Sequence, residues 1–134
     1  MVVDDHPRVL EAARTILGRK YDVVGSATTG RGAVDLSLRL DPDAIVLDID
    51  MPGLDGFQAA AQIRKAGSNA RIVFLSNYAG EDYVLASVSQ GASAFVAKAR
   101  MEFDLLAAVD HPAIARSQWS LASVVIPWMA RQTL

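Results

Sequence analysis

Short apolar runs alternate with amphipathic segments along this chain of 134 residues, and this alternation restricts its fold more than any other feature. The runs cover residues 1–3, 21–24, 44–47, 71–75 and 94–97, and β-branched residues recur in them, as in buried strands. A segment with helical periodicity follows each run, beginning near Pro7, Thr28, Asp55, Glu81 and Met101. A strand–helix unit repeated five times predicts an α/β fold, (βα)5, with a parallel five-stranded sheet, right-handed crossovers and helices on both faces.

Charged residues stand directly after three of the expected strands. Asp4 and Asp5 follow the first, Asp48 follows the third, and Lys98 follows the fifth. In an open parallel sheet, ligands bind outside the carboxyl ends of the strands, so these side chains are expected to converge there. Three crowded carboxylates repel one another and favour a divalent cation with oxygen ligands. Such a cation can stabilise a phosphoryl group that moves onto a carboxylate.

The composition is that of a globular protein, with 51% apolar residues, 21% charged residues and a net charge of −2. A weakly acidic chain argues against nucleic acid as a direct partner, because phosphate backbones select basic surfaces. The chain has no cysteine, which is compatible with a reducing compartment. It contains no apolar run of the ~18 residues that a membrane span requires. We therefore expect a cytoplasmic protein without a membrane partner.

Each candidate residue also has an ordinary structural interpretation. The ordinary role of Asp5 is to cap the following helix, and that of Lys98 is to be a solvated surface lysine. Ser76, directly after the fourth strand, is on this interpretation a turn residue, and Phe95 in the fifth strand is a core residue. The coincidence of these residues at the ends of strands one, three, four and five makes a common site the better interpretation.

Four groups of residues carry a resemblance to a known family. They are the opening Val2-Val3-Asp4-Asp5-His6-Pro7, the segment from Leu47 to Gly56 (LDIDMPGLDG), Leu75-Ser76, and Phe95-Val96-Ala97-Lys98. In this order and spacing they resemble the receiver domain of two-component response regulators, most closely the nitrate-regulator and LuxR-type subfamily. The resemblance covers residues 1–110 and implies a flavodoxin-like, doubly wound sheet with the strand order 2-1-3-4-5.

The resemblance also implies a phosphorylation site. Asp48 would be the phosphoacceptor, taking a phosphoryl group from a sensor histidine kinase. Asp5 and Asp48 would bind Mg²⁺ directly together with the backbone carbonyl of Asp50, and Asp4 would hold the ion through water. Lys98 would pair with the phosphoryl oxygens.

Two further residues would convert phosphorylation into a signal. Ser76 would form a hydrogen bond with the phosphoryl group and move toward it, and Phe95 would turn inward as an aromatic switch. The change would alter protein–protein contacts of the fourth helix, fifth strand and fifth helix, where Leu85, Val88 and Phe95 lie.

The two ends of the chain depart from the usual family pattern. Residues 1–3 form a shorter first strand than receivers usually have. Residues 111–134 are a C-terminal extension, too short for the DNA-binding domain of the subfamily. Packing of this extension on its own receiver or self-association is the favoured interpretation, with an edge strand or the remnant of a longer regulator as alternatives. A homodimer would form through this extension or through the fourth-helix, fifth-strand and fifth-helix face.

Three functions are compatible with these residues. The first is a phosphorylation-dependent switch that uses Mg²⁺, with self-directed phosphoryl transfer and autodephosphorylation but no enzymatic turnover of an external substrate. The alternative is a non-phosphorylated adaptor or dimerisation module, which the complete set of acidic residues disfavours. The third is a phosphatase of the haloacid-dehalogenase type, suggested by Asp48-Ile49-Asp50 but disfavoured by Pro52 and by the short chain.

Overall fold

A five-stranded parallel sheet forms the centre of the computed structural model, which describes residues 1–77, 85–87, 89 and 91–110. The strand order is β2-β1-β3-β4-β5, as the resemblance to receiver domains implies. The strands are β1 (Val2–Val3), β2 (Ser26–Ala27), β3 (Ala44–Asp48), β4 (Arg71–Ser76) and β5 (Ala94–Ala97). All neighbouring pairs are parallel, so the carboxyl ends of the strands lie at the same edge.

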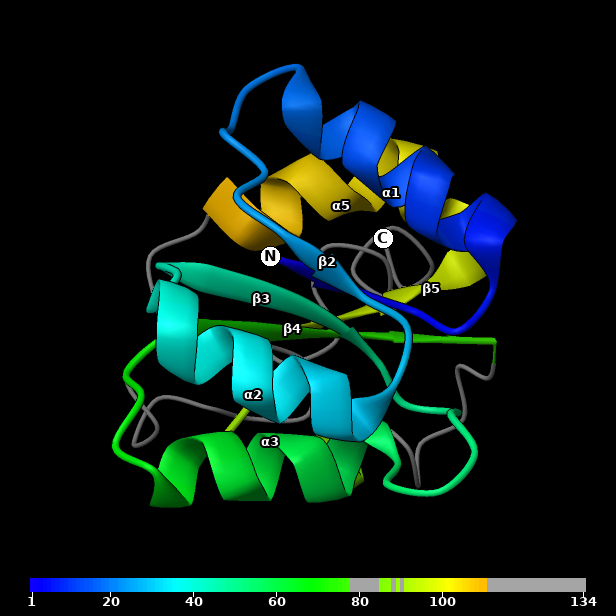
Figure 1. Ribbon diagram of the computed structural model, residues 1–134. Helices are drawn as coiled ribbons and strands as arrows, with labels where there is room; N and C mark the ends of the chain where they lie inside the picture. The colour runs from blue at the N-terminus through cyan, green and yellow to red at the C-terminus, as the bar shows by residue number, and fades with distance from the viewer. Residues whose placement is uncertain (78–84, 88, 90, 111–134) are drawn as a thin grey trace.

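Helices cover both faces of this sheet (Figure 1). They are α1 (Pro7–Gly18), α2 (Gly30–Leu40), α3 (Gly56–Lys65) and α5 (Met101–Asp110), with a 3₁₀ turn, η1 (Lys98–Arg100), before α5. Figure 1 shows α1 and α5 on one side of the sheet and α2 and α3 on the other. None of the helices in the described ranges is long and apolar enough to cross a membrane.

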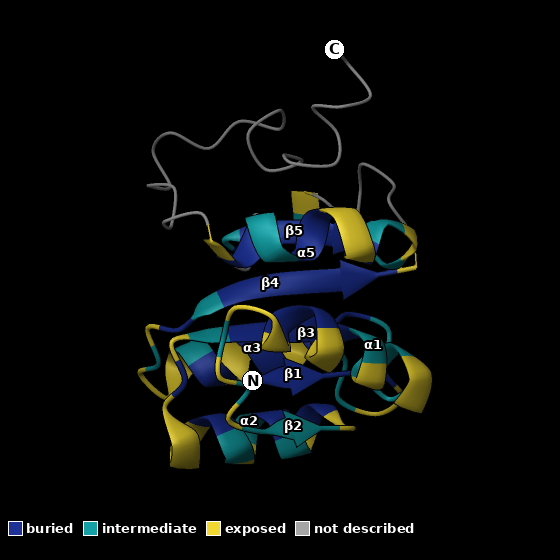
Figure 2. Ribbon diagram, turned by 90° about the horizontal axis from the view of Figure 1, so that it is seen from above, coloured by how far each residue is buried: buried dark blue, intermediate teal, exposed yellow. Residues whose placement is uncertain are grey.

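Each face of the sheet has its own apolar core. On one face, Ile45 and Leu47 pack with Ala33 of α2 and Ile63 of α3. On the other, strand residues including Val46 and Val73 pack with Ile16 of α1 and Leu105 of α5. The central strands β1, β3 and β4 are buried along their length, apart from partly exposed residues at the amino ends of β3 and β4 (Figure 2). Burial on both faces explains why these strands read as continuous apolar runs in the sequence.

Side chains fix the starts of two helices. Thr29 caps α2 by accepting a hydrogen bond from the backbone N–H of Gly32, and Asp55 caps α3 in a reciprocal capping box with Gln58. The N-cap of α1 is His6, whose side chain makes no capping hydrogen bond. The structural interpretation of Asp5 as a simple helix cap is therefore wrong, and its carboxylate is available for another role.

The second strand differs from the prediction. The sequence predicts it at residues 21–24, but β2 is Ser26–Ala27. Its partner explains the shift, because β1 pairs only through Val2 and Val3, which lie opposite Ser26 and Ala27. The residues before Gly25 have no described strand beside them, and Val24 is half exposed.

A groove lies at the amino end of β1. The amino group of Met1 is buried there and donates a hydrogen bond to the carbonyl of Ala44 (3.1 Å). The groove has a volume of about 440 Å³, and its walls include Val23, Val24 and Asp43. Burial lowers the pKa of the Met1 amino group, although the nearby Asp43 carboxylate opposes this change.

The predicted fourth helix lies mostly outside the described residues, and the C-terminal extension lies entirely outside them. Of the predicted fourth helix, residues 85–87 and 89 are helical. The extension at residues 111–134, with its alternative interpretations, lies wholly outside, and so does Val88.

The start of α3 is held against the strand that carries Asp48. The backbone N–H of Gly56 donates a hydrogen bond to the carbonyl of Ile49 (2.9 Å). A Cβ atom at Gly56 would collide with the carbonyl oxygen of Asp48 and with the Cα of Ile49. Because both neighbours are backbone atoms of β3 and its loop, they cannot move without shifting the site.

We predict that Gly56→Ala lowers the free energy of unfolding by about 1–3 kcal/mol, the usual cost of overpacking. The matched control is Gly18→Ala in the last turn of α1, where a Cβ meets nothing within 4 Å. The control should leave stability unchanged or raise it by up to about 1 kcal/mol, since alanine favours helix. Urea unfolding followed by circular dichroism measures both changes, and equal effects of the two substitutions would contradict this account.

Candidate functional site

The three predicted strand ends meet at one point. Asp4 directly follows β1, Asp48 is the last residue of β3, and Lys98 is the first residue after β5. The side chains of both aspartates are fully buried, and that of Lys98 is only 8% exposed. The sheet order places β3 between β1 and β4, so residues from opposite ends of the sequence become neighbours.

Lys98 joins the two buried carboxylates. Its Nζ lies 2.9 Å from Oδ2 of Asp4 and 3.1 Å from Oδ1 of Asp48. The interpretation of Lys98 as a solvated surface lysine is therefore wrong. An ammonium placed between two carboxylates partly neutralises them where water does not.

The two oxygens of the Asp48 carboxylate differ in their surroundings. Oδ1 accepts a hydrogen bond from the backbone N–H of Asp50 (3.1 Å) in addition to its contact with Lys98. Oδ2 is buried and has no hydrogen-bond partner among the described residues. A buried oxygen of this kind is costly unless it receives a proton, a cation or a covalent partner.

The electrostatics of the cluster follow from burial. Burial raises the pKa of Asp48 from 3.8 to about 6, and the Asp4 carboxylate adds to the rise while Lys98 opposes it. Burial alone would lower the pKa of Lys98, but its hydrogen bond to Asp4 and the charges of Asp48 and Asp4 raise it. Lys98 is therefore a permanent cation, and one cation faces two carboxylates.

Ser76 is the last residue of β4 and is fully buried. Its Oγ donates a hydrogen bond to Oδ2 of Asp50 at 3.2 Å. The sequence analysis gives Asp50 a role through its backbone carbonyl, and the structure adds this contact of its side chain with Ser76. Asp50 lies two residues after Asp48 in the sequence, so this contact holds the Ser76 hydroxyl at the loop that follows Asp48.

Asp5 completes the acidic cluster together with a residue that the sequence analysis does not single out. The Asp5 side chain is 25% exposed, and its Oδ1 lies 3.0 Å from Nδ1 of His6. One potential ligand atom from each of Asp4, Asp5, His6 and Asp48 lies within 4.8 Å of the others. The position of His6 next to two acidic residues was the signal that could have identified it.

These residues fit a divalent metal ion. The cluster offers three carboxylates, and the buried Oδ2 of Asp48 points to a missing positive partner. Hard divalent cations prefer carboxylate oxygens, and the partly exposed Asp5 leaves a way for the ion to enter.

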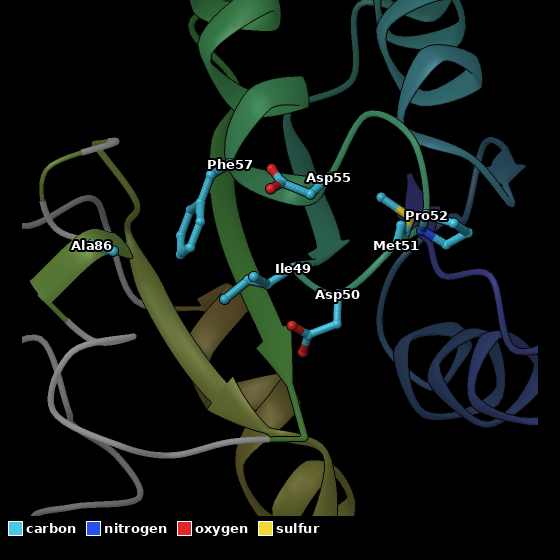
Figure 3. A pocket seen from close by; sticks show the side chains of 7 residues that line it. All are labelled: Ile49, Asp50, Met51, Pro52, Asp55, Phe57 and Ala86. Atoms are coloured by element: carbon cyan, nitrogen blue, oxygen red, sulfur yellow. The ribbon is translucent and has the colours of Figure 1, made fainter.

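A pocket of about 580 Å³ lies beside the cluster on the side of Asp50. Figure 3 shows the side chains of Ile49, Asp50 and Phe57 around this space, with Ala86 on the opposite side. Asp48 does not line the pocket. Open space therefore lies next to the Asp50 side chain, which the Ser76 hydroxyl contacts.

Phe95 is fully buried in β5 and belongs to the core on the side of α2 and α3. The ring thus has the position of a core residue in this state. On the expected docking face, Leu85 is 49% exposed and Phe103 of α5 is 67% exposed. Leu85 from the predicted fourth helix and Phe103 of α5 are thus large apolar side chains with exposed surface.

The geometry agrees with comparisons to known proteins. Residues 1–110 match the response regulator receiver domain. The chain belongs to this family of two-component signalling proteins.

Individual relatives place it near the nitrate-regulator and LuxR-type receivers. The chain is 32% identical over 132 residues to the nitrate/nitrite response regulator protein NarL of Escherichia coli (strain K12), covering 97% of this chain and 60% of NarL. A LuxR-family two-component response regulator from Aurantimonas sp. SI85-9A1 is 27% identical, with a TM-score of 0.76, covering 100% of this chain and 96% of that chain. The CheX–CheY–BeF3–Mg²⁺ complex from Borrelia burgdorferi contains a chain that is 26% identical, with a TM-score of 0.71, covering 81% of this chain and 83% of that chain.

We predict that the burial of Asp48 makes the protein less stable as the pH rises. Its pKa of about 6 in the folded state lies above the ordinary value of 3.8, so the folded state binds more protons between these values. The free-energy cost of keeping an ionised Asp48 carboxylate buried is absent below about pH 4 and complete above about pH 6. Asp48→Asn removes it, and at pH 7.5 the variant should be more stable than wild type by on the order of 1–3 kcal/mol.

Urea unfolding at pH 4.5 and pH 7.5 without divalent cations measures this difference. The control is Asp35→Asn, on the exposed surface of α2, which should shift neither value. A stability gain for Asp48→Asn that is the same at both pH values would show that the effect is not due to titration of Asp48.

Proposed function

We propose that this protein is a phosphoacceptor receiver of a two-component phosphorelay, in which Asp48 takes a phosphoryl group from a histidine kinase. The observation that carries the proposal is the buried Asp48 carboxylate, which has one oxygen without a hydrogen-bond partner and the other beside Lys98. A structural carboxylate would have both oxygens satisfied. A nucleophile needs an oxygen that is free to form a bond.

The proposed reaction is an in-line displacement at phosphorus. Asp48 Oδ2 supplies an electron pair that forms the new O–P bond, while the N–P bond to the kinase histidine breaks and its bonding pair stays on the imidazole nitrogen. Lys98 Nζ, now held by Asp4 and Asp48, is within reach of the phosphoryl oxygens. Its charge would oppose the negative charge that the transferred group brings.

A bound Mg²⁺ would neutralise charge on the phosphoryl oxygens and on the carboxylates. We assign Asp5, Asp48 and the backbone carbonyl of Asp50 as direct ligands, and Asp4 as a ligand through water. The acidic cluster around Asp48 supports this assignment, and so does the similarity to the CheY complex that holds BeF3 and Mg²⁺.

The switch would begin at Ser76. Its hydroxyl now donates to Asp50, and a phosphoryl group on Asp48 would offer a more strongly charged acceptor. Movement of Ser76 would free space in the core for Phe95 to change its rotamer. The surface formed by residues 85–89, β5 and α5 would then present different contacts, with homodimer formation as one outcome.

The chain spans about 60% of NarL, the relative to which it is 32% identical. We propose that residues 1–110 are the receiver and that residues 111–134 are an extension rather than a DNA-binding domain. Within this chain, the output would be a change of protein contacts in the cytoplasm. Any catalysis would be limited to formation and hydrolysis of the phosphoryl group on Asp48.

The test is acyl-phosphate formation with acetyl phosphate and Mg²⁺, followed by intact-protein mass spectrometry. Wild type should gain the mass of one phosphoryl group, because Asp48 is activated by Lys98 and the cation. Asp48→Asn should gain none, and removal of Mg²⁺ with a chelator should reduce the yield by at least about tenfold.

The matched control is Asp35→Asn, which removes an exposed carboxylate and should be modified like wild type. If a folded wild-type protein gains no phosphoryl group and its melting temperature does not respond to Mg²⁺, the adaptor or dimerisation function becomes the better one. Modification that persists in Asp48→Asn would place the phosphoacceptor elsewhere.

A further inference from the structure

We propose that His6 is a ligand of the cation held by the acidic cluster, and that it makes the site favour a divalent transition cation such as Mn²⁺ over Mg²⁺. This inference rests on the proposed metal site and adds a nitrogen ligand to its carboxylates.

The distances around the imidazole carry the argument. Nδ1 of His6 lies 3.0 Å from Oδ1 of Asp5 and 3.5 Å from Oδ1 of Asp4. Neighbouring ligands of an octahedral ion at roughly 2.1 Å are about 3 Å apart. His6 and Asp5 therefore already have the separation of two adjacent ligands of one ion, while Asp4, at the longer distance, remains the ligand that acts through water.

The backbone holds the imidazole in this place. The N–H of His6 donates to Oδ1 of Asp4 at 2.8 Å, which closes a tight turn directly after β1. Pro7 follows in the first turn of α1 and fixes the exit of the chain. The His6 side chain makes no helix-capping hydrogen bond, so its contacts with Asp4 and Asp5 are not part of a cap of α1.

A second observation points into the same space. Oδ2 of the fully buried Asp48 has no hydrogen-bond partner among the described residues, and Asp48 belongs to the same group of ligand atoms as His6. The imidazole is 60% exposed and so lies at the mouth of the cluster, whereas Asp48 lies at its base. An ion between them would have carboxylate oxygens on the inner side and a nitrogen on the outer side.

The chemistry of the added ligand gives the selectivity. Mg²⁺ strongly prefers oxygen ligands and keeps several waters, whereas imidazole is a common ligand of first-row transition metals. Exchange of one water for an imidazole nitrogen therefore adds affinity for Mn²⁺ and its neighbours in the series but little for Mg²⁺.

The direct test is pulsed electron paramagnetic resonance of the full chain with Mn²⁺ alone at pH 7.5. A bound imidazole nitrogen produces ¹⁴N modulation of the electron spin echo. The chain has two histidines, so His6→Ala and His111→Ala form a matched pair in which each variant lacks one imidazole. We expect the modulation in wild type and in His111→Ala, and its loss in His6→Ala.

Affinity gives a second readout. Competition between Mn²⁺ and Mg²⁺, followed by the signal of free Mn²⁺, yields the ratio of their dissociation constants. In His6→Ala the preference for Mn²⁺ should fall by about tenfold, a change typical when a group that supports metal binding is lost. His111→Ala should keep the wild-type ratio. His6→Gln, which keeps a polar side chain at this exposed position, serves as a second variant should His6→Ala unfold.

The outcomes separate this inference from the proposed function. Equal ¹⁴N modulation and an equal selectivity ratio in wild type and His6→Ala would overturn the role of His6 and leave phosphorylation of Asp48 unaffected. Mn²⁺ binding that survives in Asp48→Asn but is lost in His6→Ala would show a histidine site independent of the phosphoacceptor, and would also overturn the shared site. A folded wild-type protein that binds neither cation would overturn both.

Discussion

The contact of Lys98 with Asp4 and Asp48 is the interaction on which the rest of the site depends. Two carboxylates without exposed surface could not both remain charged at this edge of the sheet without a cation between them. One ammonium cannot balance them, and Asp5 adds a third negative group nearby. The cluster therefore keeps an unsatisfied negative charge. Because its members come from three strand ends, this charge exists only when the whole sheet has formed.

Much of the fold could be predicted from the sequence because its signals are local. Apolar runs and helical periodicity give the order of elements, and Thr29 and Asp55 mark two helix starts that the structure confirms. The second strand was placed wrongly because a strand at the edge of a sheet is defined by its partner. Tyr21 to Val24 have a suitable composition, but β1 offers paired residues only opposite Ser26 and Ala27.

The site was predictable to a different degree for each residue. Asp4, Asp48 and Lys98 follow apolar strands, so the topology brings them together as expected. The side-chain contact between Ser76 and Asp50 depends on how the loop after β3 bends, which no periodic pattern encodes. The sequence analysis did not identify His6 as a site residue for a related reason. Its significance lies in distances to Asp4 and Asp5, and a single histidine in a sequence gives no distances.

The buried amino group of Met1 has a practical consequence for anyone who attaches a tag or a label at this end. The hydrogen bond to the Ala44 carbonyl requires only one N–H of the Met1 amino group, and burial disfavours the positive charge of this group. Conversion of the amine to an amide, by acetylation or by fusion, would keep the hydrogen bond and remove the charge. The residues of a fused linker would then enter the groove between Val24 and Ala44. A β-branched linker and a glycine linker are therefore not equivalent there, because the side chains of the first would have to fit the groove beside the strand that leads into Asp4.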